Sequence, residues 1–131
     1  MRYLLDVNAL IALGHVRHVH HERAQFWQSG LSAGVDVLGT CAITELGFVR
    51  VSVQSGLQPG VATAQAALAK LKASGPVTYK LWTDAVGADH LPAYVRKPAE
   101  LTDGHLLELA RVHGARLVTL DVSIPDALLI P

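Results

Sequence analysis

The chain contains very little cysteine: Cys41 is the only one among 131 residues. A single cysteine cannot form an intrachain disulfide, and it cannot supply the several thiolates that a structural zinc site requires. Long apolar runs are also missing, since none approaches the roughly 20 residues that a membrane-spanning helix needs. The first residues show no secretory signal pattern. We therefore expect a soluble protein of the cytoplasm, with no membrane partner.

The chain has no excess of charge of either sign. Eleven Lys and Arg residues balance eleven Asp and Glu residues, so the formal net charge is zero. Nucleic-acid-binding proteins are usually basic, so the composition gives no support to a nucleic-acid partner. A neutral total can still contain local patches, and a metal-loaded acidic site can itself attract phosphate. Any functional interpretation must therefore depend on motifs.

What the chain does contain is hydrophobic sequence in a regular alternation. Half of the residues are hydrophobic, which is sufficient for a single compact domain over residues 1–131. Short apolar runs alternate with stretches of helical spacing that end at glycine or proline. Strands are expected at 3–5, 35–39, 77–82 and 116–120, and helices at 8–13, 18–29, 40–53, 59–72 and 102–113. This alternation predicts an α/β fold, a three-layer α/β/α domain with a central, mainly parallel sheet.

Four acidic residues lie where such a sheet gathers its ligands. Asp6 and Asp121 come at the ends of predicted strands, and Glu45 and Asp103 lie in the first turns of predicted helices. Ligands of open parallel sheets bind outside the carboxyl ends of the strands. We therefore expect the four carboxylates to meet at one edge of the sheet. Their oxygens are the ligands that a hard divalent cation such as Mg²⁺ prefers.

Four segments around these acids resemble a known family. They are DVNALIAL at 6–13, TELGFVR at 44–50, LTDGHLL at 101–107 and LVTLD at 117–121. In this order, and over nearly the whole chain, they resemble the PIN domain and in particular its VapC toxin branch. The resemblance implies a Mg²⁺- or Mn²⁺-dependent endoribonuclease, the toxin of a toxin–antitoxin pair. It also implies an RNA substrate, a small antitoxin protein as partner, and a homodimer. The positions that match the family's acidic cluster are Asp6, Glu45, Asp103 and Asp121.

The chemistry of phosphodiester hydrolysis suggests a role for each of these residues. A bound divalent ion acidifies a water molecule and polarises the phosphoryl oxygen, and two ions about 4 Å apart stabilise the attacking and leaving oxygens together. Asp6 and Asp103 are the expected principal ligands. Glu45 and Asp121 are expected to bind a second ion or to orient the attacking water. Arg50, about one turn beyond Glu45, is the candidate phosphate contact. Donors of hydrogen bonds to the carboxylates are expected among Asn8, Thr44, Thr102 and Thr119.

Two alternative classes of function remain open at the level of the sequence. Each acid taken alone has a structural explanation, because Asp and Thr are common helix caps and Glu is common in first turns. The first alternative is accordingly a catalytically silent PIN-like domain that binds protein or RNA. The second is a receiver or phosphatase domain on a similar sheet. It is disfavoured because Asp6 has no acidic neighbour, Asn8 stands where a phosphatase carries a second Asp, and no lysine follows Lys97.

The remaining conspicuous feature is a histidine cluster next to Glu22, formed by His15, His18, His20 and His21. Imidazoles are good zinc ligands. The spacing of a His-Glu-x-x-His zinc motif is nevertheless absent, because Gln25 stands where the second histidine belongs. We therefore expect a polar helix face here. His105 is likewise expected to be a partly exposed helix residue, and Trp27 and Trp82 to be core or interface anchors.

Overall fold

The computed structural model describes residues 1–131 and is built around one sheet of five parallel strands. The strands are β1 (Arg2–Leu5), β2 (Val37–Thr40), β3 (Thr78–Leu81), β4 (Arg116–Thr119) and β5 (Leu128–Leu129). Their order in space is β3-β2-β1-β4-β5, and every neighbouring pair is parallel. The chain therefore runs outward from β1 through β2 to β3, and then returns to the other side of β1 with β4. The order reverses between β1 and β4, which is where open α/β sheets form their ligand crevice.

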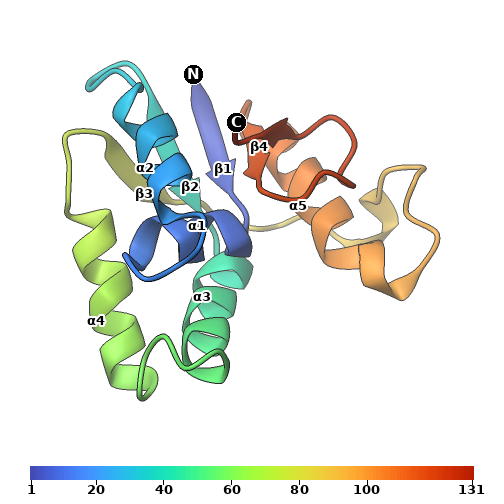
Figure 1. Cartoon of the computed structure of the whole chain (residues 1–131). Helices are drawn as coiled ribbons and strands as arrows, with labels where there is room; N and C mark the ends of the chain where they lie inside the picture. The colour runs from blue at the N-terminus through green and yellow to red at the C-terminus, as the bar shows by residue number, and fades with distance from the viewer.

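Five α-helices cover the two faces of this sheet. They are α1 (Val7–Gly14), α2 (His21–Ser29), α3 (Ala42–Gln54), α4 (Val61–Lys72) and α5 (Leu101–Val112). The first four helices lie on one side of β1, and α5 lies on the other (Figure 1). The three-layer prediction is therefore confirmed. None of the helices has the length and apolar character that a membrane crossing requires.

Adjacent residues of the central strands supply the two cores on opposite faces. Leu5 and Val118 belong to the larger core, which α1 to α4 complete. Leu4 and Leu117 belong to the smaller core, which α5 completes. All four side chains are fully buried. Side chains alternate between the faces of a strand, so a continuous apolar run is what a sheet covered on both faces needs.

The sequence places most elements to within a few residues, with two differences. The second helix begins at His21 instead of residue 18, because residues 16–20 form turns in which the His18 ring accepts a hydrogen bond from the His20 N–H. Strand β5 was not predicted. It consists of Leu128 and Leu129 only, and two residues are too few to show a periodic pattern. Two short 3₁₀ helices, Ala88–His90 and Pro98–Glu100, lie between the predicted strand at 77–82 and the predicted helix at 102–113.

Candidate active site

Asp6 lies directly between β1 and α1, and the fold holds both of its carboxylate oxygens. Oδ1 accepts a hydrogen bond from the Ala9 N–H at 2.8 Å, which caps α1. Oδ2 accepts one from the Thr119 hydroxyl at 2.5 Å. The side chain is almost completely buried, with 4% of its residue surface exposed. Asp6 is therefore a fixed carboxylate at the β1 side of the crevice.

Thr119, the last residue of β4, connects Asp6 to Asp121. Its hydroxyl donates to Asp6 and accepts a hydrogen bond from the Asp121 N–H at 2.9 Å. Asp121 is in turn oriented by Ser123, whose N–H and hydroxyl both donate to Oδ1 at 2.8 and 2.7 Å. Those two hydrogen bonds lower the pKa of Asp121 and outweigh the small opposing effect of burial. Asp121 is therefore held as a carboxylate at the β4 side of the crevice.

The three aspartates lie within electrostatic reach of one another. Burial raises the pKa of Asp6 to about 6, and the charges of Asp103 and Asp121 act in the same direction, while the hydrogen bonds from Thr119 and Ala9 oppose them. Burial and the charge of Asp121 also raise the pKa of Asp103, which lies in the first turn of α5. The crevice thus gathers negative charge from β1, β4 and α5 that the protein itself does not neutralise.

Glu45, the fourth acid, is held in a separate ion pair. Its Oε2 accepts hydrogen bonds from the Thr40 hydroxyl at 2.5 Å and from the Lys72 ammonium at 2.6 Å. It is not among the charges that shift the pKa values of the three aspartates. The structure therefore brings Asp6, Asp103 and Asp121 together and holds Glu45 against α4.

The structure places the expected hydrogen-bond donors differently from the sequence analysis in several cases. Thr119 donates to a candidate acid, as described above. Thr44 does not: its hydroxyl donates to the Cys41 carbonyl and accepts from the Cys41 N–H, because it caps α3 from inside the first turn. Asn8 and Thr102 are exposed and donate to no carboxylate.

A further donor, Thr40, was not predicted. Thr40 ends β2 as Thr119 ends β4, and this shared position at a strand end could have identified it from the sequence.

Arg50 is exposed on α3 and takes part in no ion pair within the chain. Its guanidinium is therefore available to an external anion. The assignment of Arg50 as a phosphate contact stays a prediction.

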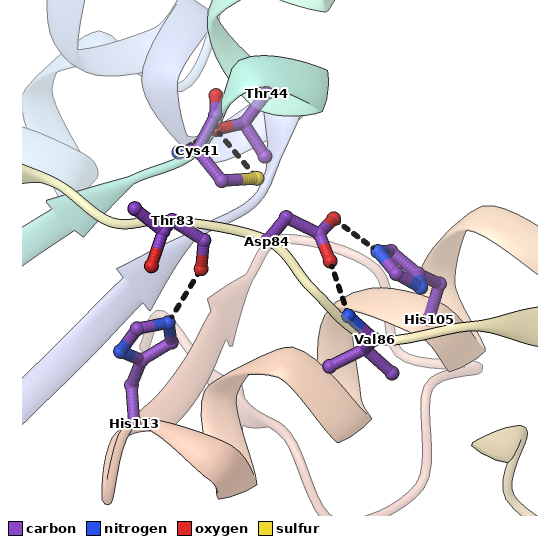
Figure 2. Close-up of polar contacts among 7 residues, drawn as sticks. All are labelled: Cys41, Thr44, Thr83, Asp84, Val86, His105 and His113. Atoms are coloured by element: carbon purple, nitrogen blue, oxygen red, sulfur yellow. Dashed lines mark hydrogen bonds and ion pairs between the residues drawn. The ribbon is translucent and has the colours of Figure 1, made fainter.

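A second polar group, which the sequence analysis missed, anchors the segment after β3 to α5 (Figure 2). The Asp84 carboxylate accepts hydrogen bonds from His105 Nε2 at 2.5 Å and from the Val86 N–H at 3.1 Å. His113 Nε2 donates to the Thr83 carbonyl at 2.8 Å. Burial would raise the pKa of Asp84, but these hydrogen bonds and the nearby histidines lower it overall. His105 is thus a docking residue for the 83–86 segment.

The histidine cluster serves the connection between α1 and α2. His15 Nδ1 donates to the Ile11 carbonyl at 3.0 Å, and His21 Nδ1 donates to the Ala12 carbonyl at 2.7 Å. Both bonds satisfy carbonyl groups near the end of α1 that lack helical partners. These two rings are therefore engaged with the backbone.

The donor chemistry of the crevice fits a hard divalent cation. All of its candidate ligand atoms are carboxylate oxygens. Burial, with the charges of Asp103 and Asp121 added, raises the pKa of Asp6, and a bound cation would oppose this rise. No three His, Cys, Asp or Glu side chains are close enough to hold one ion jointly in the present arrangement. Mg²⁺ commonly takes only one or two carboxylates directly and completes its shell with water. The assignment of Asp6 and Asp103 as the principal ligands stays a prediction.

The burial of Asp6 predicts a stability effect in the metal-free protein. The folded-state pKa of about 6 lies above the usual 3.8, so the stabilisation associated with the proton is complete below pH 4 and is lost as the pH rises through 6. Asparagine has no proton to lose, so Asp6→Asn keeps this stabilisation at high pH. We expect the free energy of unfolding of the variant to exceed that of wild type by up to about 3 kcal/mol at pH 7.5. Asn retains the helix cap.

Urea unfolding in EDTA at pH 4 and pH 7.5 measures this effect. The exposed Asp89→Asn serves as the control, with no pH-dependent gain expected. An Asp6→Asn protein that is less stable than wild type at pH 7.5 would contradict the assignment of an unneutralised, buried carboxylate.

Comparison with known protein families agrees with this geometry. The PIN domain family matches residues 3–127. Ribonuclease VapC38 of Mycobacterium tuberculosis (strain ATCC 25618 / H37Rv) is 40% identical, with 92% of this chain and 86% of the relative covered. Ribonuclease VapC39 of the same strain is 38% identical, with 97% and 94% covered. Both relatives therefore align with this chain over most of its length.

Solved structures share the fold at much lower identity. VapBC2 from Rickettsia felis, bound to a DNA fragment from its promoter, superimposes with a TM-score of 0.67 at 14% identity, over 98% of this chain and 97% of the other. VapC20 of Mycobacterium tuberculosis, described as a sarcin-ricin loop cleaving toxin, gives 0.64 at 14% identity, over 98% and 99%. The sheet is parallel and carries carboxylates at its switch point. The family model matches nearly the whole chain, and the relatives are 38–40% identical to it. The chain belongs to the PIN-domain family, in its VapC branch.

Proposed function

We propose that this protein is an endoribonuclease toxin that hydrolyses RNA phosphodiester bonds with water activated by Mg²⁺ or Mn²⁺. The observation that carries the proposal is the group of three aspartates, Asp6, Asp103 and Asp121, at the ends of β1 and β4 and the start of α5. Burial raises the pKa of Asp6 to about 6, and the charges of Asp103 and Asp121 act in the same direction. The relatives named as ribonucleases support the class of reaction. RNA as the substrate would place this activity in the cytoplasm.

In the proposed mechanism the protein residues hold the reacting groups in place. A divalent cation bound in the crevice supplies acidification of water and neutralisation of the phosphoryl charge. Asp6 and Asp103 are its proposed principal ligands. Thr119 fixes Asp6, and Ser123 fixes Asp121, so both carboxylates are oriented before substrate arrives.

Glu45 and Arg50 are assigned to contacts with the attacking water and with the RNA. Glu45 uses only Oε2 for its contacts with Thr40 and Lys72, and its Oε1 accepts no hydrogen bond from the chain. That oxygen is our candidate for orienting the attacking water, while Asp121 is the candidate for a second ion. Arg50 is the proposed contact to a flanking phosphate.

A small antitoxin protein is the proposed partner. The structure named VapBC2, a likeness in fold, supports the idea that chains of this architecture occur in such pairs. Expression of this chain without a partner is expected to arrest bacterial growth. The homodimer that the resemblance implies stays a prediction, which light scattering of the purified protein measures.

Cleavage of a structured RNA tests the proposed function directly. We expect cleavage with Mg²⁺ or Mn²⁺, no cleavage in EDTA, and recovery when the ion is restored, because the crevice needs a cation to generate its nucleophile. Cleavage that continues in EDTA would contradict the metal mechanism. No cleavage under any condition, together with tight binding of a small protein partner, would favour a catalytically silent domain.

A further inference from the structure

Lys72 makes the one contact that links α4 to a candidate catalytic acid. It is the last residue of α4, and its Nζ lies 2.6 Å from Glu45 Oε2 in the first turn of α3. The two side chains are 28% and 21% exposed, so the pair is partly shielded from water. Lys70, the other lysine of the same helical turn, is exposed and takes part in no ion pair.

The contact is directed at one oxygen of Glu45. Thr40, at the end of β2, donates to the same Oε2 at 2.5 Å, so this oxygen is held from the sheet and from α4 at once. Glutamate has three side-chain torsions, and two contacts to one oxygen restrict them. The other oxygen, Oε1, is left without a partner in the chain. The pair thus orients the carboxylate as well as neutralising it.

The surroundings of the pair are open to solutes. Glu45 and Lys72 line a cavity of about 590 Å³ between α3 and α4, together with Leu46, Leu68 and Tyr79. Neither end of the ion pair is therefore sealed in the core. Solutes can therefore reach the ion pair from this cavity.

We propose that Lys72 is a positioning residue of the active site, which holds Glu45 with Oε1 presented to the reaction and balances its charge. Without Lys72, Glu45 keeps only its hydrogen bond from Thr40, and its negative charge is no longer balanced. The inference rests on the proposed function, because it assigns a purpose to Glu45 in RNA cleavage. Lys72 lies outside the four sequence segments that surround the candidate acids, so these segments alone do not identify it.

Four substitutions separate positioning from a general loss of charge or of helix packing. Lys72→Met removes the ammonium and keeps the aliphatic stem, Lys70→Met removes the same charge from the same helical turn, and Lys72→Arg restores a donor. The fourth is Glu45→Gln, alone and combined with Lys72→Met. For each protein the measurements are kcat and KM for a structured RNA, the Mn²⁺ dissociation constant by calorimetry, and the unfolding temperature.

The expected result is a kcat effect that depends on Glu45. Lys72→Met should lower kcat about tenfold, as loss of groups that orient metal-site carboxylates does, with little change in KM. Its Mn²⁺ dissociation constant should stay near the wild-type value, because Asp6 and Asp103, the proposed principal ligands, are unchanged. Lys70→Met should match wild type, Lys72→Arg should recover most of kcat, and Lys72→Met should slow the Glu45→Gln protein no further.

Three outcomes would overturn the inference, and the first two leave the proposed function unaffected. If Lys72→Met matches Lys70→Met in kcat while wild type cleaves RNA, Lys72 has no role in the site. If only the unfolding temperature falls, Lys72 merely ties α4 to α3. If wild type cleaves no RNA with any divalent ion, the proposed function fails and the role of Lys72 fails with it.

Discussion

Replacing Asp103 by asparagine is expected to lower the rate of RNA cleavage by about 100-fold or more, because changes outside the first ligand shell alone already cost 10–100-fold. Asp103 is half-buried in the first turn of α5, and the charge of Asp121 adds to burial in raising its pKa. Asparagine keeps the shape of the side chain and removes the charge that a cation needs. Since Asp103 accepts no hydrogen bond from the chain, the fold should be preserved.

This prediction is measured as kcat/KM with Mn²⁺, alongside the Mn²⁺ dissociation constant. The matched control is Asp89→Asn, the same chemical change at a side chain that is 81% exposed. We expect the control to cleave and to bind Mn²⁺ as wild type does. Cleavage by Asp103→Asn at the wild-type rate would remove Asp103 from the site. An equal loss in both variants would point to net charge instead of a specific ligand.

The largest effect on stability is expected from Phe48→Ala, which should lower the free energy of unfolding by about 3–5 kcal/mol. Phe48 is completely buried on α3, and its ring stacks on His15 with centroids 5.0 Å apart. A Cβ atom built at Gly14 would lie 2.7 Å from the ring, so Phe48 occupies the space that glycine leaves at the end of α1. Truncation would leave a cavity between α1 and α3, the helices that follow Asp6 and carry Glu45.

Urea unfolding followed by tryptophan fluorescence measures this loss. The chain offers a matched control in its only other phenylalanine, Phe26, which is 80% exposed on α2. Phe26→Ala should change the free energy of unfolding by less than about 0.5 kcal/mol. If both variants unfold at the same urea concentration, the packing of α3 on α1 does not depend on Phe48 in the way the structure indicates.

Local pattern was sufficient to predict most of this fold. The apolar run before Asp6 predicts β1, and helical spacing ended by Gly14 predicts α1, as the structure has them. The short strand β5 could not be predicted from the sequence, because Leu128 and Leu129 become a strand only by pairing with Val118 and Thr119. Secondary structure that depends on a distant partner leaves no periodic signal in its own residues.

Thr44 shows that the hydrogen-bond partner of a side chain is also difficult to predict from the sequence. The sequence predicts that a threonine beside a candidate acid donates to that acid. In the first turn of a helix, however, the nearer partner is the backbone of the preceding cap residue. Thr40 shows the opposite case, a donor to a candidate acid that the sequence did not predict. It carries no helix motif, yet its place at the carboxyl end of β2 puts its hydroxyl against Glu45.

The sequence by itself determined which acids the chain carries, their order, and their places at strand ends and first helical turns, because each of those positions is set by a local pattern. The tertiary structure alone decided how the acids divide: Asp6, Asp103 and Asp121 repel one another across the β1/β4 crevice, while Glu45 is paired with Lys72. That pair spans 27 positions, from the start of one helix to the end of the next. Only the packing of α4 against α3 brings its charges together, and no local pattern reports such packing.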